Sequence, residues 1–172
     1  MKGMEEGFIE IGGIQVPSDF IVECKWVTEE LAFGGMIGTV ANMRGLRENG
    51  FTHVLDLQAE FDDSDLGAEA GTEVLWLAVP EPITALPPEI IERAVAFANE
   101  VLSDRANKLY VHCLAGRNRA PLFAYAILRS MGQSPHQALQ RIRTLEPKAR
   151  LGEGHLSLIE EFFSWQSTGE FA

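Results

Sequence analysis

The segment KLYVHCLAGRNRAP, residues 108–121, brings a cysteine, a glycine and an arginine into one short stretch of chain. A run typical of a β-strand ends at Cys113, a loop follows, and an apolar helix-like segment begins at about Arg119 or Ala120. In open α/β sheets, ligands bind where a parallel strand ends and the next helix begins. Backbone N–H groups of such a loop and of the first helical turn can converge on an anion. The segment therefore predicts an anion site beside a thiol.

The residue types in this loop suit nucleophilic attack on a phosphate group. The electrostatic field that favours a bound anion also favours the thiolate of Cys113 over the thiol. Gly116 allows the loop to curve tightly, and Arg119 offers a planar fork of donors to two phosphate oxygens. The phosphate is expected to meet the loop residues Leu114, Ala115, Gly116, Arg117, Asn118 and Arg119. A nucleophile, an anion cradle and a bidentate cation thus occupy a single loop.

Strands and helices are expected to alternate around this loop. Short apolar runs at 52–58 and 74–79, and the run that ends at Cys113, are typical of strands. Between the last two, the segment 87–102 opens with prolines and carries a helical apolar period, so strand, helix and strand predict a parallel crossover. The apolar face of this helix is expected to consist of Ile90, Ala94, Phe97 and Val101.

The remaining segments complete a three-layer α/β domain, in the order αβα, with a mostly parallel central sheet. A hairpin within the first 35 residues is expected at the edge of the sheet. Ser134 begins a capping box that opens one helix. Further helices are expected at 40–50, 121–132, 135–145 and 155–166, and the second of these is apolar nearly all round and should be buried.

Composition limits the class of protein. The chain has 172 residues, of which 46% are hydrophobic and 23% charged, which is typical of one soluble globular domain. It contains no apolar run of membrane-spanning length, and its N-terminus does not resemble a signal peptide, so we expect a cytoplasmic protein without membrane insertion. The net charge of −11 argues against nucleic acid as a partner. Two cysteines and four scattered histidines show no metal-ligand spacing, so we expect no metal.

The loop resembles the Cys-x5-Arg signature of cysteine-dependent protein tyrosine and dual-specificity phosphatases at His112, Cys113, Gly116 and Arg119. The resemblance covers roughly residues 24–163, so 1–23 would be an N-terminal extension of a single phosphatase-like domain, 1–172. It implies hydrolysis of phosphate monoesters through a phosphocysteine intermediate, without a cofactor. The substrate would be a phosphorylated protein or a small phosphomonoester. The sequence decides neither the natural substrate nor the oligomeric state.

The resemblance also implies a general acid on a loop before the cysteine. Glu81, 32 residues before Cys113, holds this place, although the family usually has aspartate there. Asp62, Asp63 and Asp65 remain alternative acids. A second departure is Ala120, where the family usually has a serine or threonine whose hydroxyl assists the leaving thiolate.

Other functions remain open at this point. Glu81 and Ala120 would also suit a catalytically weak phosphate-binding module. A phosphatase of a non-protein substrate, such as a phosphoinositide or a phosphoglucan, would present the same loop. A rhodanese-like sulfurtransferase also uses a cysteine in an anion-cradling loop. His112 is expected to orient the loop by hydrogen bonding rather than to act as a base.

Overall fold

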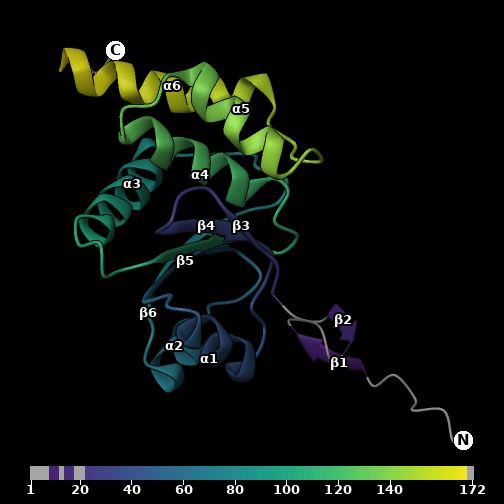
Figure 1. The fold of residues 1–172 in the computed structure, drawn as a ribbon. Helices are drawn as coiled ribbons and strands as arrows, with labels where there is room; N and C mark the ends of the chain where they lie inside the picture. Colours follow the sequence, from purple (N-terminus) through teal and green to yellow (C-terminus); the bar gives the residue numbers. More distant parts are fainter. Residues whose placement is uncertain (1–7, 12–13, 18–21, 170–172) are drawn as a thin grey trace, which may run out of the picture.

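The central sheet has five strands: β3 (Cys24–Trp26), β4 (Leu31–Gly34), β5 (His53–Gln58), β6 (Glu73–Val79) and β7 (Leu109–His112). The computed structural model describes residues 8–11, 14–17 and 22–169. In it, the strands lie in the order β3-β4-β7-β5-β6, and β4, β7, β5 and β6 are parallel (Figure 1). β3 pairs with β4 in the antiparallel sense. The predicted mostly parallel sheet, its three predicted strands and its edge hairpin are all confirmed.

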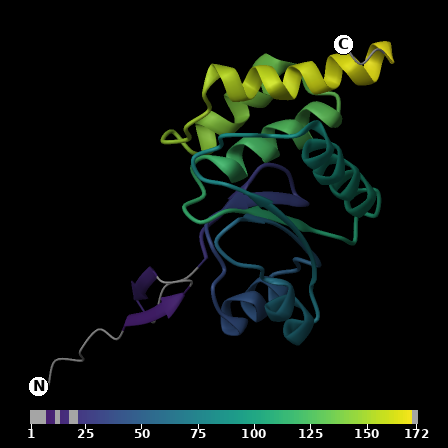
Figure 2. The ribbon, with the colours of Figure 1, turned by 180° about the vertical axis from the view of Figure 1, so that it is seen from behind.

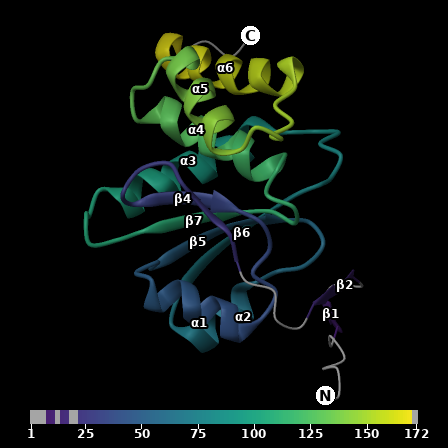
Figure 3. The same ribbon diagram turned by 45° about the vertical axis from the view of Figure 1, so that its right-hand side comes forward.

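Helices cover both faces of the sheet, as Figures 1 and 2 show from opposite sides. One face carries α1 (Val40–Glu48) and α2 (Ser64–Ala70). The other face carries α3 (Pro88–Leu102) and α4 (Arg119–Ser130), and α5 (Pro135–Leu145) and α6 (Glu153–Thr168) pack on the outer side of α4. Figure 3 shows the same layering with the strands seen more nearly side on. The three-layer αβα class is confirmed.

The layers bury the central elements almost completely. Every residue of β7 is buried, and so is α4 from Arg119 to Leu128, which confirms the predicted buried helix. The capping box of α5 forms as predicted: the Ser134 hydroxyl accepts from the Gln137 N–H, and the Gln137 side chain accepts from the Ser134 N–H. The loop between β7 and α4 is therefore held at both ends by buried elements.

The apolar face of α3 differs from the prediction. Its buried side chains are Ile91, Ala94, Val95, Ala98 and Val101, whereas Ile90 and Phe97 are only half-buried at the border of the core. The buried face is therefore centred on Ala94 and Ala98, whose small side chains let α3 pack closely against its neighbours. The predicted crossover is confirmed, and α3 carries the chain from β6 over β5 to β7.

Residues before β3 contain a second, separate sheet. Strand β1 (Phe8–Ile11) pairs with β2 (Ile14–Pro17) in the antiparallel sense. The rest of the expected extension, 1–7, 12–13 and 18–21, lies outside the described residues. Over the described ranges, no helix has the length and apolar character needed to cross a membrane.

Candidate active site

The sulfur of Cys113 lies at the carboxyl end of β7, the middle strand of the sheet. The Cys113 N–H donates to the Gly34 carbonyl at 3.3 Å, which continues the pairing of β7 with β4. Cys113 is 2% exposed, and its Sγ accepts a hydrogen bond from the backbone N–H of Ala120 at 3.4 Å. Neither Cys113 nor Cys24 forms a disulfide. The thiol is therefore buried under the loop and lies against the first turn of α4.

The loop packs backbone against backbone on the end of β4. Gly116 has a φ of +71°, in the left-handed region that favours glycine. A Cβ atom on Gly116 would lie 2.7 Å from the carbonyl carbon of Gly34 and 2.8 Å from the nitrogen of Gly35. The Met36 N–H donates to the Leu114 carbonyl at 3.0 Å across the same contact. Both conformation and space thus require glycine at position 116.

The guanidinium of Arg119 is held below the loop by a glutamate that the sequence did not single out. Its Nη1 and Nη2 donate to the two carboxylate oxygens of Glu60 at 2.9 and 2.8 Å, and Nη1 also donates to the Val79 carbonyl at 2.9 Å. The Arg119 side chain is 1% exposed, yet its Nε has no hydrogen-bond partner among the described residues. Glu60 thus occupies the Nη end of the guanidinium, and the Nε–H is the donor left for an oxyanion.

Glu81 lies beside the Nε–H of Arg119. Its Oε2 is 3.4 Å from this nitrogen, and its Oε1 accepts a hydrogen bond from the side-chain amide of Asn118 at 2.7 Å. The Glu81 side chain is 39% exposed, so solvent reaches it. The fold thus brings the carboxyl on the loop after β6 to the loop after β7. Its role as the acid stays a prediction.

The three alternative acids lie elsewhere. Asp62 and Asp65 are exposed, and the Asp62 carboxylate accepts from the N–H and hydroxyl of Ser64 at the start of α2. Asp63 is completely buried beside His112. Of the hydrogen bonds and ion pairs between described residues, none joins these aspartates to the segment 113–119, so the geometry favours Glu81 over them.

His112 connects the loop to a buried pair of carboxylates on the other face of the sheet. Its Nδ1 lies 3.3 Å from the Cys113 carbonyl, and its Nε2 lies 3.0 Å from Asp63 Oδ2 and 3.6 Å from Asp56 Oδ1. Burial alone would lower the pKa of His112, but Asp63 and Asp56 outweigh it and raise this pKa above its ordinary value. Burial raises the pKa of Asp56 to about 6, against the opposing charge of His112. The contacts suit the orienting role expected of His112.

These three side chains also form the group of the described residues best placed to hold a metal ion. One ligand atom from each lies within 4.8 Å of the others, and all three residues are buried. The His112 ring lies beside both carboxylates, so its positive charge, when it is protonated, would offset theirs.

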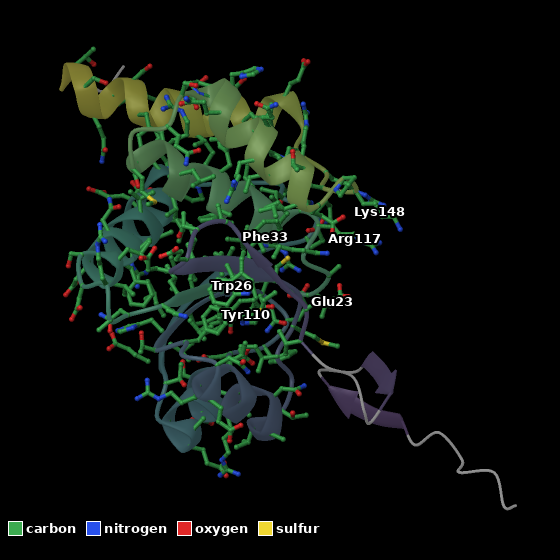
Figure 4. All side chains as sticks on the ribbon, viewed as in Figure 1. Glu23, Trp26, Phe33, Tyr110, Arg117 and Lys148 are labelled. Carbon is green, nitrogen blue, oxygen red and sulfur yellow. The ribbon has the colours of Figure 1, made fainter. Side chains whose placement is uncertain are left out.

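A small cavity adjoins the loop on the α6 side. Its volume is about 470 Å³, and it is lined by Asn118, Ala149, Arg150, Leu151, Gly152 and His155. The Arg150 N–H donates to the Arg117 carbonyl at 2.7 Å, which fixes this wall to the loop. In Figure 4 the side chains of Arg117 and Lys148 both point outward into solvent. A larger cleft, of about 1370 Å³, lies near the amino ends of β4 and β7, and none of residues 113–119 lines it.

Comparison with known proteins places this geometry in a common fold. No protein-family model and no curated protein matches the chain. Solved structures do: Tk-PTP in its active form matches with 23% identity and a TM-score of 0.70 over 82% of this chain and 96% of that chain. PTPMT1 matches with 22% identity and a TM-score of 0.70, over 86% and 100%. Kinase associated phosphatase matches with 15% identity and a TM-score of 0.74, over 88% and 99%. The chain therefore has the fold of the protein tyrosine and dual-specificity phosphatases.

Proposed function

We propose that this chain hydrolyses phosphate monoesters through a phosphocysteine intermediate. The observation that carries the proposal is the pairing, in one loop, of the Cys113 sulfur with a buried Arg119 whose Nε has no hydrogen-bond partner among the described residues. We expect a phosphate held by this N–H to have its phosphorus above the sulfur. Backbone N–H groups of residues 114–119 would bind its other oxygens.

The first step follows from these positions. The Cys113 thiolate attacks phosphorus, the S–P bond forms, and the bond from phosphorus to the leaving oxygen breaks. Glu81 gives its proton to the leaving oxygen, which departs as an alcohol or phenol. Arg119 and the loop N–H groups stabilise the charge on the equatorial phosphate oxygens.

The second step reverses the role of Glu81. Its carboxylate takes a proton from water while the oxygen of that water attacks phosphorus, and the S–P bond breaks to restore the thiolate. Among the described residues, the departing sulfur receives a hydrogen bond from the backbone N–H of Ala120, whose side chain has no hydroxyl to add a second. Release of phosphate completes the cycle.

Several finer statements belong to the same proposal. The chain would act in the cytoplasm as one phosphatase-like domain, with residues 24–163 as its core and 1–23 as an extension. Its substrate would be a phosphorylated protein or a small phosphomonoester. One structural neighbour, PTPMT1, has been solved in complex with PI(5)P, which supports keeping a phosphoinositide among the candidates.

A phosphate-binding module without turnover is the second candidate. It is favoured by Glu60, which already neutralises the end of the Arg119 guanidinium, and by Ala120 in place of a hydroxyl residue. One structural neighbour is described as a tyrosine phosphatase-like interacting protein. Phosphate binding without hydrolysis would identify this candidate.

The test compares the wild-type chain with Cys113→Ser on an aryl phosphate, with thiosulfate as the alternative substrate. We expect phosphate release by the wild type, at most a few per cent of that rate in Cys113→Ser, and no sulfur transfer from thiosulfate. Vanadate or phosphate should still bind the variant, because the loop and Arg119 remain. Sulfur transfer, or full turnover by Cys113→Ser, would contradict the covalent phosphatase mechanism.

A further inference from the structure

The side chain of Asn118 is hydrogen-bonded to Glu81 and not to the start of its own helix. Asn118 is the N-cap residue of α4, and asparagine at this position commonly accepts a hydrogen bond from the helix's free N–H groups. Here the side chain makes no such bond. Its amide instead donates to Oε1 of Glu81, 37 residues earlier in the chain, at 2.7 Å. The local capping interaction has been given up for a contact between two loops of the site.

This contact distinguishes the two oxygens of Glu81. Oε1 accepts the hydrogen bond from the Asn118 amide, whereas Oε2 lies 3.4 Å from the Nε of Arg119, which has no hydrogen-bond partner among the described residues. When the carboxyl is neutral, the oxygen that accepts the amide N–H is the carbonyl oxygen, and the other oxygen carries the proton. The proton would then be on Oε2, the oxygen beside the Nε of Arg119, where phosphate is proposed to bind.

The length and exposure of Glu81 make such a restraint necessary. Its side chain is 39% exposed. Glutamate also has one more rotatable bond than aspartate, the residue that the phosphatases usually have at this place. An unrestrained glutamate at this exposure would sample several rotamers, and a misplaced acid loses much of its effect. One hydrogen bond from the rigid loop removes much of that freedom.

We propose that Asn118 is a positioning residue that fixes Glu81 as the general acid and selects Oε2 as the oxygen that carries the proton. This inference rests on the proposed phosphatase function. In the first step the proton passes from Oε2 to the leaving oxygen, and the electrons of the broken P–O bond stay on that oxygen. The Asn118 amide then stabilises the Glu81 carboxylate until that carboxylate takes a proton from water in the second step.

The first experiment compares Asn118→Ala with the wild type on phosphate esters whose leaving groups differ. An alkyl phosphate, whose leaving oxygen needs a proton, should be hydrolysed about tenfold more slowly by the variant. An aryl phosphate whose phenol leaves readily should be hydrolysed within about twofold of the wild-type rate, because its departure needs little acid assistance. Vanadate affinity should stay close to that of the wild type, because alanine keeps the backbone N–H through which position 118 would bind the oxyanion.

The control is the same substitution in a Glu81→Gln background. If Asn118 acts only through the acid, Asn118→Ala should cause no further loss on the alkyl phosphate once Glu81 has no proton to give. Equal slowing of both esters by Asn118→Ala, or a full additional loss in the Glu81→Gln background, would show that Asn118 organises the loop itself. Equal activity of Asn118→Ala and the wild type on both esters would also overturn the proposal.

An exchange of one methylene group provides the rescue test. Glu81→Asp shortens the acid and should break the contact, whereas Glu81→Asp with Asn118→Gln restores the combined length of the two side chains. The double variant should therefore recover a large part of the alkyl phosphate activity that Glu81→Asp loses. A double variant no better than Glu81→Asp would count against the contact. Even in that case, phosphatase activity that is present in the wild type and lost in Cys113→Ser would still support the proposed function.

Discussion

Two glutamates approach the same guanidinium from two different loops, and their contacts differ. Glu60, on the loop after β5, binds Nη1 and Nη2 of Arg119 at 2.9 and 2.8 Å, and its side chain is 26% exposed. Glu81, on the loop after β6, is 39% exposed and lies 3.4 Å from Nε without forming a hydrogen bond there. Arg119 thus holds Glu60 by hydrogen bonds, whereas Glu81 is hydrogen-bonded to Asn118 and not to Arg119.

The difference separates two tasks that a carboxylate can perform beside an arginine. Burial by itself would raise the pKa of Glu60, but the hydrogen bonds and charge of Arg119 outweigh burial and hold this pKa below its ordinary value. Glu60 therefore stays ionised and fixes the guanidinium. A general acid must instead exchange its proton in each cycle, and the looser contact of Glu81 allows that exchange.

The largest effect is expected from the residue that both glutamates contact. Arg119→Lys keeps the positive charge but replaces the planar fork by a single ammonium group, which cannot serve Glu60 and a phosphate edge together. We expect kcat/KM for any phosphate ester to fall about a thousandfold. Steady-state kinetics on an aryl phosphate checks this, and near-wild-type turnover would remove Arg119 from the site.

Glu60→Gln tests the clamp. The guanidinium loses its charged partner but keeps its bond to the Val79 carbonyl, so Arg119 should be misplaced rather than lost. We expect kcat/KM to fall about tenfold for readily and poorly leaving groups alike, because positioning of the phosphate precedes the choice of leaving group. A loss confined to poorly leaving groups would instead assign proton donation to Glu60.

The clamp also predicts how stability depends on pH. A carboxyl whose pKa is lowered by folding stabilises the folded state above the pKa of the unfolded chain, and this contribution is lost as the pH falls through the folded pKa. Glu60→Gln should therefore cost about 1–2 kcal/mol at pH 7, allowing for the partial exposure of Glu60. The difference from wild type should shrink below about pH 4. Urea unfolding at both pH values measures it, and a difference that persists in acid would contradict the ionic clamp.

Glu81→Gln tests the looser carboxyl. Alkyl phosphate hydrolysis should slow about a hundredfold, whereas an aryl phosphate with a readily leaving phenol should be hardly affected. The wild type should show a bell-shaped pH profile with its optimum on the acidic side of neutrality, and the basic limb should flatten in the variant. Equal slowing of both esters would exclude Glu81 as the acid, and Asp62, Asp63 and Asp65 would be the next to test.

The loop could be predicted from the sequence because its parts are local. Cys113, Gly116 and Arg119 lie within one strand–loop–helix connection, so the spacing alone brings sulfur, curvature and guanidinium together. The layer order was also predictable, since apolar runs and helical periods are properties of short segments. Glu81 was found only through the resemblance to phosphatases, by its distance from the cysteine.

The partners of the loop could not be predicted, because they come from distant segments. Glu60 lies 59 residues before Arg119 and has no local feature that separates it from other loop glutamates. Asp56 and Asp63 meet His112 only because β5 and β7 pair and α2 begins at the end of the connection from β5. The helix α2 was itself missed, since Ser64–Ala70 is short and lacks an apolar period. Contacts between strands of a parallel sheet follow from topology, which residue types along one segment do not reveal.

The smallest effect is expected at Ala120, which lies beside the sulfur that leaves in the proposed second step. In the part of the chain that the structure describes, the sulfur accepts a hydrogen bond from the backbone N–H of Ala120, at 3.4 Å, and none from Glu60 or Glu81. If loss of the thiolate limits turnover, phosphoenzyme accumulates and product release begins with a burst. Ala120→Ser adds a hydroxyl donor to the residue whose N–H already reaches Sγ, so the burst should diminish and kcat should rise about threefold. Stopped-flow measurement with an aryl phosphate checks both. A linear time course in the wild type, with no gain from serine, would show that turnover is limited by the first step, in which Glu81 is the proposed acid.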